Sequence, residues 1–118
     1  MTYIPEKGDI IHLQFDPASG TEMKGRHYAL ALSPKVFNQA TGLAYVCPIS
    51  QGMAGGARSL GMLSTLQGSG THTQGNVHCH QLKSIDWRIR QAVFKEKVPN
   101  MVIEDVMARL QAILFDEY

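Results

Sequence analysis

The hydrophobic pattern of the chain changes at Pro99, and this change constrains the fold more than any other feature. Beyond Pro99, apolar residues recur at spacings of three and four, and polar residues such as Glu104 and Arg109 fall between them. The apolar positions are Val102, Ile103, Val106, Met107, Leu110, Ile113 and Leu114. This period is typical of an amphipathic helix, so we predict one C-terminal helix whose apolar stripe packs against the core or a dimer partner.

Before Pro99 the chain consists of short apolar segments separated by turn residues. Strands are predicted at residues 8–15, 27–34, 43–50, 76–83 and 90–98. Residues 35–42 are predicted to be a connector, and residues 52–70, with six of the eleven glycines, a long mobile loop or a poor hairpin. The pattern predicts a single domain, residues 1–118, with about five to seven short strands in a small β-barrel and the terminal helix.

The charge balance argues against a bulk nucleic-acid-binding protein. Eleven basic and ten acidic side chains leave a formal charge of +1, so any contact with RNA or DNA must be local. No apolar run approaches membrane-spanning length and the N-terminus lacks a signal-peptide core, so we predict a cytoplasmic location without membrane contact. Cys47 and Cys79 do not make a disulfide framework and are predicted to be small buried apolar residues.

The segment TQGNVHCHQ, residues 73–81, places two histidines on either side of a cysteine. In an extended strand, His78 and His80 share one face and Cys79 points to the other. Two interpretations stay open: an imidazole pair that transfers protons near neutral pH, or two solvent-facing strand histidines. A zinc site would need a third ligand, such as His72 from a glycine-rich loop, and Cys79 lies on the wrong face. No metal is therefore expected.

Four segments taken together resemble one protein family. They are FDPASGTEMKGR (15–26), ALSPKVFN (31–38), VCPISQG (46–52) and HQLKSIDWR (80–88). In this order and spacing they run over nearly the whole chain, which resembles a MazF/PemK-type toxin of the ChpB branch. The resemblance implies an SH3-like barrel of the CcdB/MazF/Kid type with a C-terminal helix, usually as a homodimer. It also implies cleavage of single-stranded mRNA without metal or cofactor, which inhibits translation and growth, a cognate antitoxin, and contact with operator DNA only through that antitoxin.

The resemblance also assigns site residues. Arg26 stands at the family's active-site arginine, as a phosphate clamp, although the family's Arg-Pro is here Arg26-His27. Ser50 stands at a threonine that contacts the phosphate, and His78 and His80 stand where relatives carry an arginine and an aspartate as acid and base. The further residues expected to contact RNA or order the site are Glu22, Lys24, Tyr28, Gln81 and Lys83.

Three further expectations concern the surroundings of this site. Loops 16–25 and 51–75 are predicted to flank an RNA groove across the dimer. Trp87 either stacks on an unpaired base or, as is commoner for tryptophan, packs in the interior. Two rival functions stay open: a non-cleaving toxin that traps DNA gyrase as CcdB-type proteins do, and a degenerate toxin that acts by antitoxin binding and operon repression. The chain ends Phe-Asp-Glu-Tyr and lacks the C-terminal Trp-Gly-Ile of the CcdB type, which argues against the first.

Overall fold

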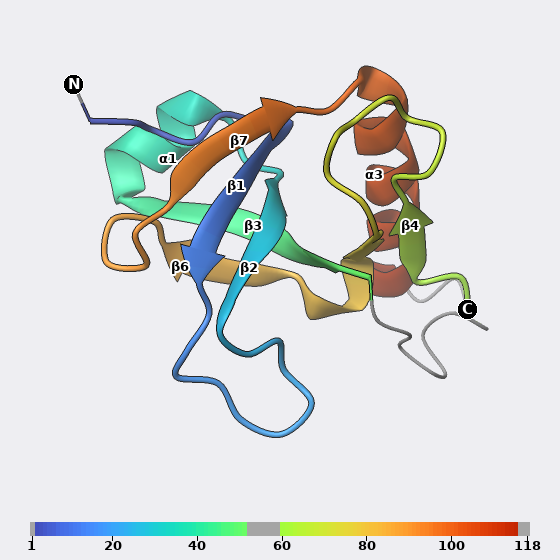
Figure 1. Cartoon of the computed structure of the whole chain (residues 1–118), viewed down its shortest axis with the longest axis horizontal. Helices are drawn as coiled ribbons and strands as arrows, with labels where there is room; N and C mark the ends of the chain where they lie inside the picture. Colours follow the sequence, from blue (N-terminus) through green and yellow to red (C-terminus); the bar gives the residue numbers. More distant parts are fainter. Residues whose placement is uncertain (1, 52–59, 116–118) are drawn as a thin grey trace.

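A seven-stranded antiparallel sheet with a long helix across it makes up the computed structural model, which describes residues 2–51 and 60–115 (Figure 1). The strands are β1 (Asp9–Gln14), β2 (Arg26–Ala31), β3 (Leu43–Ser50), β4 (Leu63–Thr65), β5 (Asn76–His78), β6 (Lys83–Asp86) and β7 (Val93–Lys97). The helices are α1 (Lys35–Thr41), the 3-10 turn η1 (Cys79–Gln81) and α3 (Asn100–Leu114). The prediction of a mainly β fold with a C-terminal helix is confirmed.

The two halves of β3 pair with different strands along one of its edges. The sheet runs β4-β5-β3-β2-β1-β7, and β6 also pairs with β3. One edge of β3 pairs with β2, and the other edge pairs with β5 near Ser50 and with β6 near Leu43. Residues 52–59 of the predicted loop lie outside the described residues. The other part of that loop, residues 60–70, contains β4, which pairs with β5.

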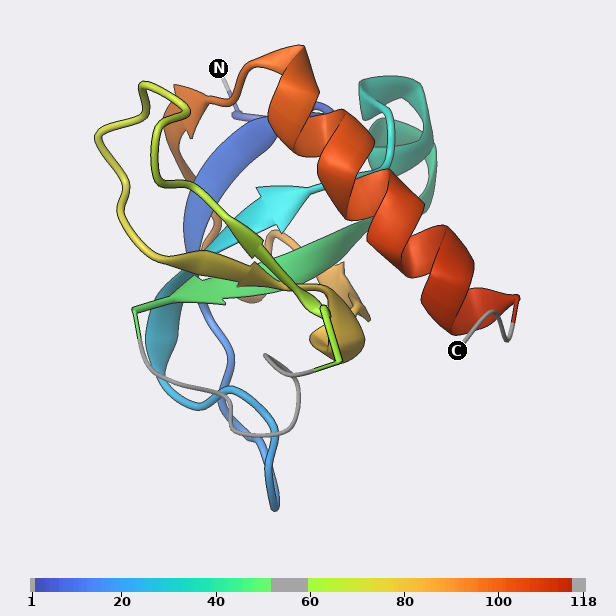
Figure 2. The ribbon, with the colours of Figure 1, turned by 90° about the vertical axis from the view of Figure 1, so that its right-hand side faces the viewer.

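Both faces of the sheet are buried, each in its own apolar cluster. On the helix face, α3 packs Val106 and its neighbours against sheet residues that include Leu30 and Ile49 (Figure 2). On the opposite face, here called the Trp87 face, Trp87 packs with residues that include Leu13. Because successive residues of a strand point to opposite faces, the cluster of one residue fixes the face of its neighbours. Cys47 and Cys79 are buried and free, as predicted.

Residues 35–41 form helix α1, so the prediction of a connector was wrong. Pro34 precedes the helix with φ −71°, and Gly42 ends it in the left-handed conformation at φ 73°. A helix of 7 residues is too short to be stable alone and depends on tertiary contacts. The hydrophobic pattern could not reveal it, because the contacts that hold it come from distant segments.

Asn38 supplies those contacts. It is fully buried, and its Nδ2 donates to the backbone oxygens of Pro5 at 2.8 Å and Ser33 at 3.0 Å. Its Oδ1 accepts from the Ser33 hydroxyl at 2.5 Å, and its backbone oxygen accepts from Trp87 Nε1 at 3.0 Å. Trp87 is 2% exposed. It is therefore an interior packing residue that ties the Trp87 face to α1.

The single strand predicted over residues 76–83 is broken into β5, η1 and β6. Six positions separate Val77 from Lys83, but their partners Ile49 and Val46 are three positions apart. The surplus residues form η1, which turns Cys79 into the helix-face cluster. Cys79 therefore points to the face opposite His78, as predicted, although the strand itself ends at His78.

Candidate functional site

Ser50 and His78 meet on the Trp87 face of the sheet. Their neighbours Ile49 and Val77 point into the helix-face cluster, so Ser50 and His78 point the other way. Ser50 Oγ lies 2.9 Å from His78 Nε2, which is a hydrogen bond. The structure thus joins two of the predicted site residues from separate strands, β3 and β5.

His78 is a buried imidazole with one ring nitrogen left over. It is 4% exposed, and its Nδ1 has no hydrogen-bond partner within residues 2–51 and 60–115. Burial lowers the pKa of His78, and the nearby His80 and His27 lower it further, so the ring is neutral near pH 7. No carboxylate among these residues orients the ring from behind. Ser50 and His78 therefore lack the third member of a nucleophilic Ser-His-Asp arrangement.

His80 lies beside His78 but faces solvent. The two ring centroids are 5.5 Å apart, and His80 is exposed. Burial of part of the ring lowers the pKa of His80. Both histidines do lie together as predicted, but the turn η1 and not strand alternation brings them there. The interpretation of two solvent-facing strand histidines fits neither residue, because His78 lies in a strand but is buried and His80 is exposed but lies in η1.

His27 belongs to the same site and was not among the predicted residues. It pairs with Leu13 across β1 and β2, and Leu13 lies in the cluster of the Trp87 face. One further step of the β2–β3 pairing places His27 opposite Ser50. The charge of His27 also contributes to the lowered pKa of His78, after burial and His80. His27 lies two residues before the buried Ala29 on β2, so strand alternation places both on the same face. This spacing would have identified His27 from the sequence.

Arg26 and Tyr28 point to the other face of β2. Arg26 Nη1 donates to Gln91 Oε1 at 3.3 Å, and its Nη2 lies 3.4 Å from His12 Nδ1. The Tyr28 ring lies 4.8 Å from the His12 ring and packs against the helix-face cluster. The structure therefore does not bring Arg26 and Tyr28 together with Ser50 and the site histidines, because adjacent strand residues alternate in direction.

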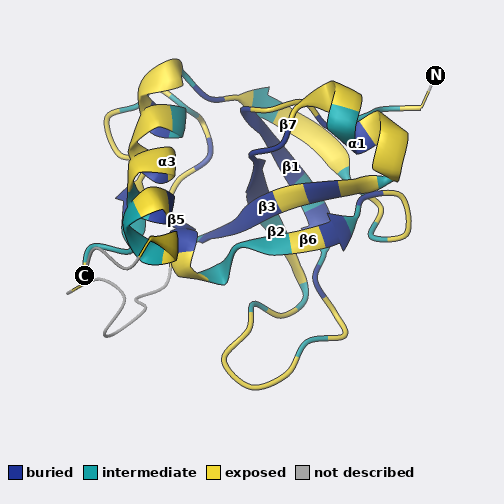
Figure 3. Cartoon of the chain, turned by 180° about the vertical axis from the view of Figure 1, so that it is seen from behind, coloured by how far each residue is buried: buried dark blue, intermediate teal, exposed yellow. Residues whose placement is uncertain are grey.

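The β1–β2 loop, residues 16–25, extends beyond the sheet and is largely exposed (Figure 3). Gln81 holds the part of this loop that leads into β2, because Gln81 Oε1 accepts from the backbone N–H of Met23 at 2.7 Å. Glu22 accepts from the backbone N–H of Ser19 at 2.9 Å and lies 3.9 Å from Lys83 Nζ. That backbone hydrogen bond and the charge of Lys83 lower the pKa of Glu22.

These braces enclose a pocket of about 460 Å³ next to the histidines, lined in part by Glu22, His80, Gln81 and Lys83. Four predicted residues therefore line one pocket, where the Lys83 ammonium lies 3.9 Å from a carboxylate oxygen of Glu22. Lys24 is exposed in the same loop and forms no salt bridge with any described residue. Its predicted contact with RNA stays a prediction.

Two properties of the wider chain complete the description of the site. Within the described ranges, no group of three His, Cys, Asp or Glu side chains is arranged to hold a metal ion. The helices within those ranges include none long and apolar enough to cross a membrane. The side chains that are present can accept a proton, donate a proton and stabilise negative charge around a bound oxyanion.

The comparisons with known proteins agree with one another. The family model described as "PemK-like, MazF-like toxin of type II toxin-antitoxin system" matches residues 6–114. The Endoribonuclease PemK of Escherichia coli is 36% identical over 92% of this chain and 81% of its own length. The Endoribonuclease toxin ChpB of E. coli strain K12 is 37% identical over 92% of this chain and 93% of its own. The crystal structure of MazE-MazF (Form-II) from Deinococcus radiodurans superposes with a TM-score of 0.81 at 32% identity, covering 97% of this chain and 98% of that one.

Proposed function

Because the chain belongs to the PemK-like, MazF-like family of type II toxins, we propose that it is a toxin that cleaves single-stranded mRNA at specific sequences without a metal ion, and so inhibits translation and growth. The relatives in E. coli are endoribonucleases, which supports cleavage over the gyrase-binding alternative. The observation that carries the chemistry is the 2.9 Å contact between Ser50 Oγ and His78 Nε2, with the His80 ring 5.5 Å from the His78 ring.

RNA carries its own nucleophile, the 2′-hydroxyl next to the scissile phosphate. Its attack on phosphorus needs a base for the 2′ proton and an acid for the departing 5′-oxygen. It also needs groups that stabilise the negative charge of the phosphorane. The attacking and leaving oxygens lie in line, on opposite sides of phosphorus. Two proton-transfer groups on opposite sides of one phosphate-binding hydroxyl would satisfy this requirement.

His27, on the strand at one edge of β3, and His80, beside His78 at the other edge, are the proposed acid–base pair. His80 has a lowered pKa, so it stays neutral near pH 7 and takes the 2′ proton as general base. His27 donates a proton to the departing 5′-oxygen as the general acid. The new 2′-oxygen–phosphorus bond forms as the phosphorus–5′-oxygen bond breaks, which gives a 2′,3′-cyclic phosphate and a 5′-hydroxyl. Exchange with water restores both histidines.

His78 acts through Ser50. With the ring neutral and Nε2 protonated, His78 donates to Ser50 Oγ, which leaves the hydroxyl hydrogen free to bond a phosphate oxygen. His78 is therefore a positioning residue, because burial keeps its ring away from the RNA. Lys83, at the edge of the same pocket as His80, supplies positive charge for the phosphorane. Arg26, predicted from the resemblance to be the phosphate clamp, has no part in this mechanism.

The proposed partners follow from the family. The neighbour from D. radiodurans is a MazE-MazF complex, which supports a cognate antitoxin for this chain. We propose that the antitoxin covers the RNA site, that the toxin forms a homodimer, and that it reaches operator DNA only through the antitoxin. Inhibition follows if antitoxin residues occupy the pocket of His80 and Lys83.

The test is cleavage of a long single-stranded RNA by the purified protein in the presence of a chelator, followed by mapping of the new 5′ ends. We expect 5′-hydroxyl ends at a small set of sites, and no cut at a site whose 2′-hydroxyl is replaced by hydrogen. His27→Ala is expected to lower the rate strongly, while the adjacent Arg26→Ala serves as the matched control and keeps most of it. Absence of cleavage would refute the proposed function, and equal losses in the two variants would refute the assignment of His27.

A further inference from the structure

A second pocket, of about 690 Å³, is lined by residues of β4 and β5 that pair with Ser50 and His78, and by Arg109 of α3. Asn76, which lines it, is the pairing partner of Ser50 across β3 and β5. Leu63, which also lines it, is the pairing partner of His78 across β4 and β5. The pocket therefore begins one strand pairing away from Ser50 and His78.

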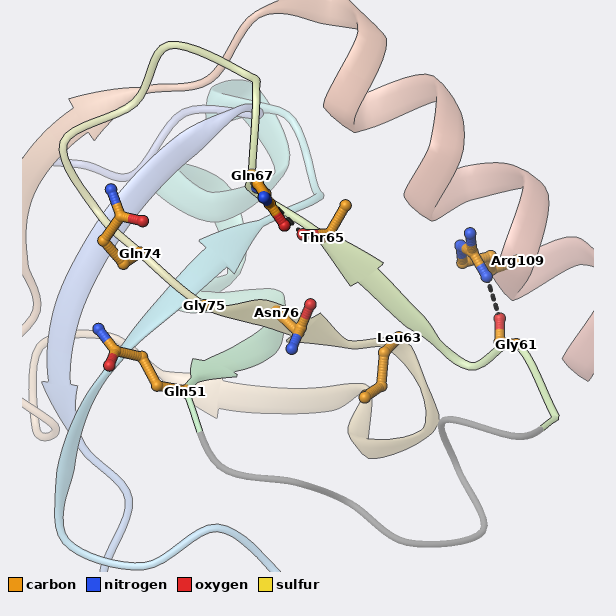
Figure 4. Close-up of a pocket in the computed structure, with 9 residues that line it drawn as sticks. All are labelled: Gln51, Gly61, Leu63, Thr65, Gln67, Gln74, Gly75, Asn76 and Arg109. Atoms are coloured by element: carbon orange, nitrogen blue, oxygen red, sulfur yellow. Dashed lines mark hydrogen bonds between the residues drawn. The ribbon is translucent and has the colours of Figure 1, made fainter.

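The lining is polar but carries almost no free charge. Gln51, Thr65, Gln67, Gln74 and Asn76 contribute four carboxamides and a hydroxyl. Figure 4 shows Asn76 in the middle of the pocket, with Gln51 and Gln74 towards one end and Arg109 with Gly61 at the other. The amides of Gln67, Gln74 and Asn76 form no hydrogen bond with any other described residue, so they are available to a ligand. We call this the carboxamide pocket.

Among the described residues of the lining, the one charged group is already paired. Arg109 Nε donates to Asp105 at 3.0 Å, and Arg109 Nη1 donates to the backbone oxygen of Gly61. The described part of the carboxamide pocket therefore offers mainly neutral donors and acceptors. It suits a planar polar group with donors and acceptors along its edge.

The loop that carries Gln74 is fixed at both ends. On one side, the Glu96 carboxylate accepts from the backbone N–H and the hydroxyl of Thr73, at 2.7 and 2.6 Å. On the other side, Gly75 has φ +115°, and a Cβ there would lie 2.6 Å from the backbone oxygen of Ser50. Only glycine allows this approach. The pocket is thus preorganised although its mouth is open, and preorganisation reduces the entropic cost of binding.

We infer that the carboxamide pocket binds the edge of one unpaired nucleobase next to the scissile phosphate and so determines which nucleotide is accepted there. This inference rests on the proposed function. A carboxamide presents one donor group and one acceptor, which matches the adjacent donor and acceptor on a base edge, and proteins read single-stranded RNA through such edges. The 2.9 Å contact of Ser50 and His78 marks the phosphate position, and Asn76 lies opposite Ser50, so the base read is an immediate neighbour of the cut.

The experiment compares cleavage of a randomised single-stranded RNA by the wild-type protein, Gln74→Ala and Asn76→Ala, with all cut sites aligned. Gln74 is exposed, so its truncation leaves the fold intact, and thermal unfolding checks both variants. We expect the wild type to prefer one base at a position adjacent to the cut. Each variant should lose about 5- to 100-fold of that discrimination and keep its preferences elsewhere. Gln39→Ala, on the exposed surface of α1, is the matched control and should behave as wild type.

A binding measurement gives a second readout that does not depend on cleavage. A 2′-O-methyl RNA that contains the preferred site cannot be cut, and the same RNA with an abasic nucleotide at the tested position removes the base. The wild type should bind the abasic RNA more weakly, whereas Gln74→Ala should bind both equally.

The outcomes separate the two proposals. A wild type that cuts no RNA overturns the proposed function and this inference together. A wild type that cuts, but whose base preference is absent or is unchanged in both pocket variants, overturns this inference alone. A change confined to antitoxin affinity would likewise overturn it, because the pocket would then be a protein-binding surface.

Discussion

Asn38 and His78 are both buried polar side chains, one close to the start of β3 and the other close to its end, but their surroundings differ. Asn38 is fully buried, and its side-chain nitrogen and oxygen all have partners. His78 is 4% exposed, has one partner in Ser50, and has none for Nδ1 among the described residues. An unsatisfied buried polar atom costs about 1–3 kcal/mol.

The difference separates a residue that builds the fold from one that serves a site. Asn38 joins α1 to Pro5, Ser33 and Trp87, and the Ser33 hydroxyl accepts in turn from the backbone N–H of Tyr45 in β3, so these bonds are architectural. The bond that His78 makes positions a hydroxyl beside an open pocket, at the cost of an orphaned nitrogen. Substitutions at the two ends of β3 should therefore affect different measurements, stability at one end and catalysis at the other.

The largest expected effect is on catalysis at the His78 end. His80→Ala removes the proposed general base, so kcat/KM for RNA cleavage should fall about 10²- to 10⁴-fold. His80 is exposed, so the free energy of unfolding should stay within about 0.5 kcal/mol of wild type. The measurement is cleavage of a defined oligonucleotide together with urea unfolding. A full retention of activity would remove His80 from the mechanism.

The next effect is on stability at the other end. Asn38→Ala leaves the carbonyls of Pro5 and Ser33 and the hydroxyl of Ser33 without their partner, so the free energy of unfolding should fall by about 2–4 kcal/mol. Activity per folded molecule should be unchanged at a temperature where the variant stays folded. Chemical denaturation measures the first quantity, and active-site titration with tight-binding RNA normalises the second. A stable but inactive variant would contradict the division of roles.

These two residues also show what the sequence could and could not reveal. Strand β3 was predicted at residues 43–50 and α3 close to its observed bounds, because hydrophobic period is local information. Helix α1 was missed because Asn38 is held by residues far away in the sequence. Short helices of this kind have no periodic signal of their own.

The features of the site also divide into those that the sequence could predict and those that it could not. Ser50, His78 and His80 were found from the resemblance, and the structure brings them together. The burial of His78 could not be predicted, because His78 is held between strands that come from distant parts of the chain, by pairing with Leu63 of β4 and by the bond to Ser50 of β3. The separation of Arg26 from the site was predictable in principle, since strand alternation puts neighbouring residues on opposite faces.

A smaller effect tests the Asn38 network from its other side. Trp87→Phe keeps most of the ring in the Trp87-face cluster but removes the Nε1 donor to the Asn38 backbone oxygen. Loss of that bond and of some buried area should lower the free energy of unfolding by about 1–2 kcal/mol, with RNA cleavage unchanged. Urea denaturation and the cleavage assay provide the comparison. A selective loss of RNA binding would instead support the alternative in which Trp87 stacks on a base.

The smallest effect is a pH dependence that belongs to His78 and has no counterpart at Asn38. Burial lowers the pKa of His78 in the folded chain below its ordinary value of 6.5. Between that lowered value and 6.5 the unfolded chain binds the extra proton, so the free energy of unfolding falls as pH drops through this window. Above 6.5 both states are neutral at this position and His78 adds no slope.

His78→Gln keeps a donor towards Ser50 and cannot titrate, so it should lose less stability than wild type between about pH 7.5 and about pH 5.5. A residual slope is expected from His12 and His80, whose pKa values are also lowered by burial. Asn38→Ala is the matched control, and although less stable throughout, it should keep the wild-type slope because it removes no ionisable group. Equal slopes in wild type and His78→Gln would show that the buried imidazole does not titrate on unfolding, and the contrast between the two ends of β3 would then rest on catalysis alone.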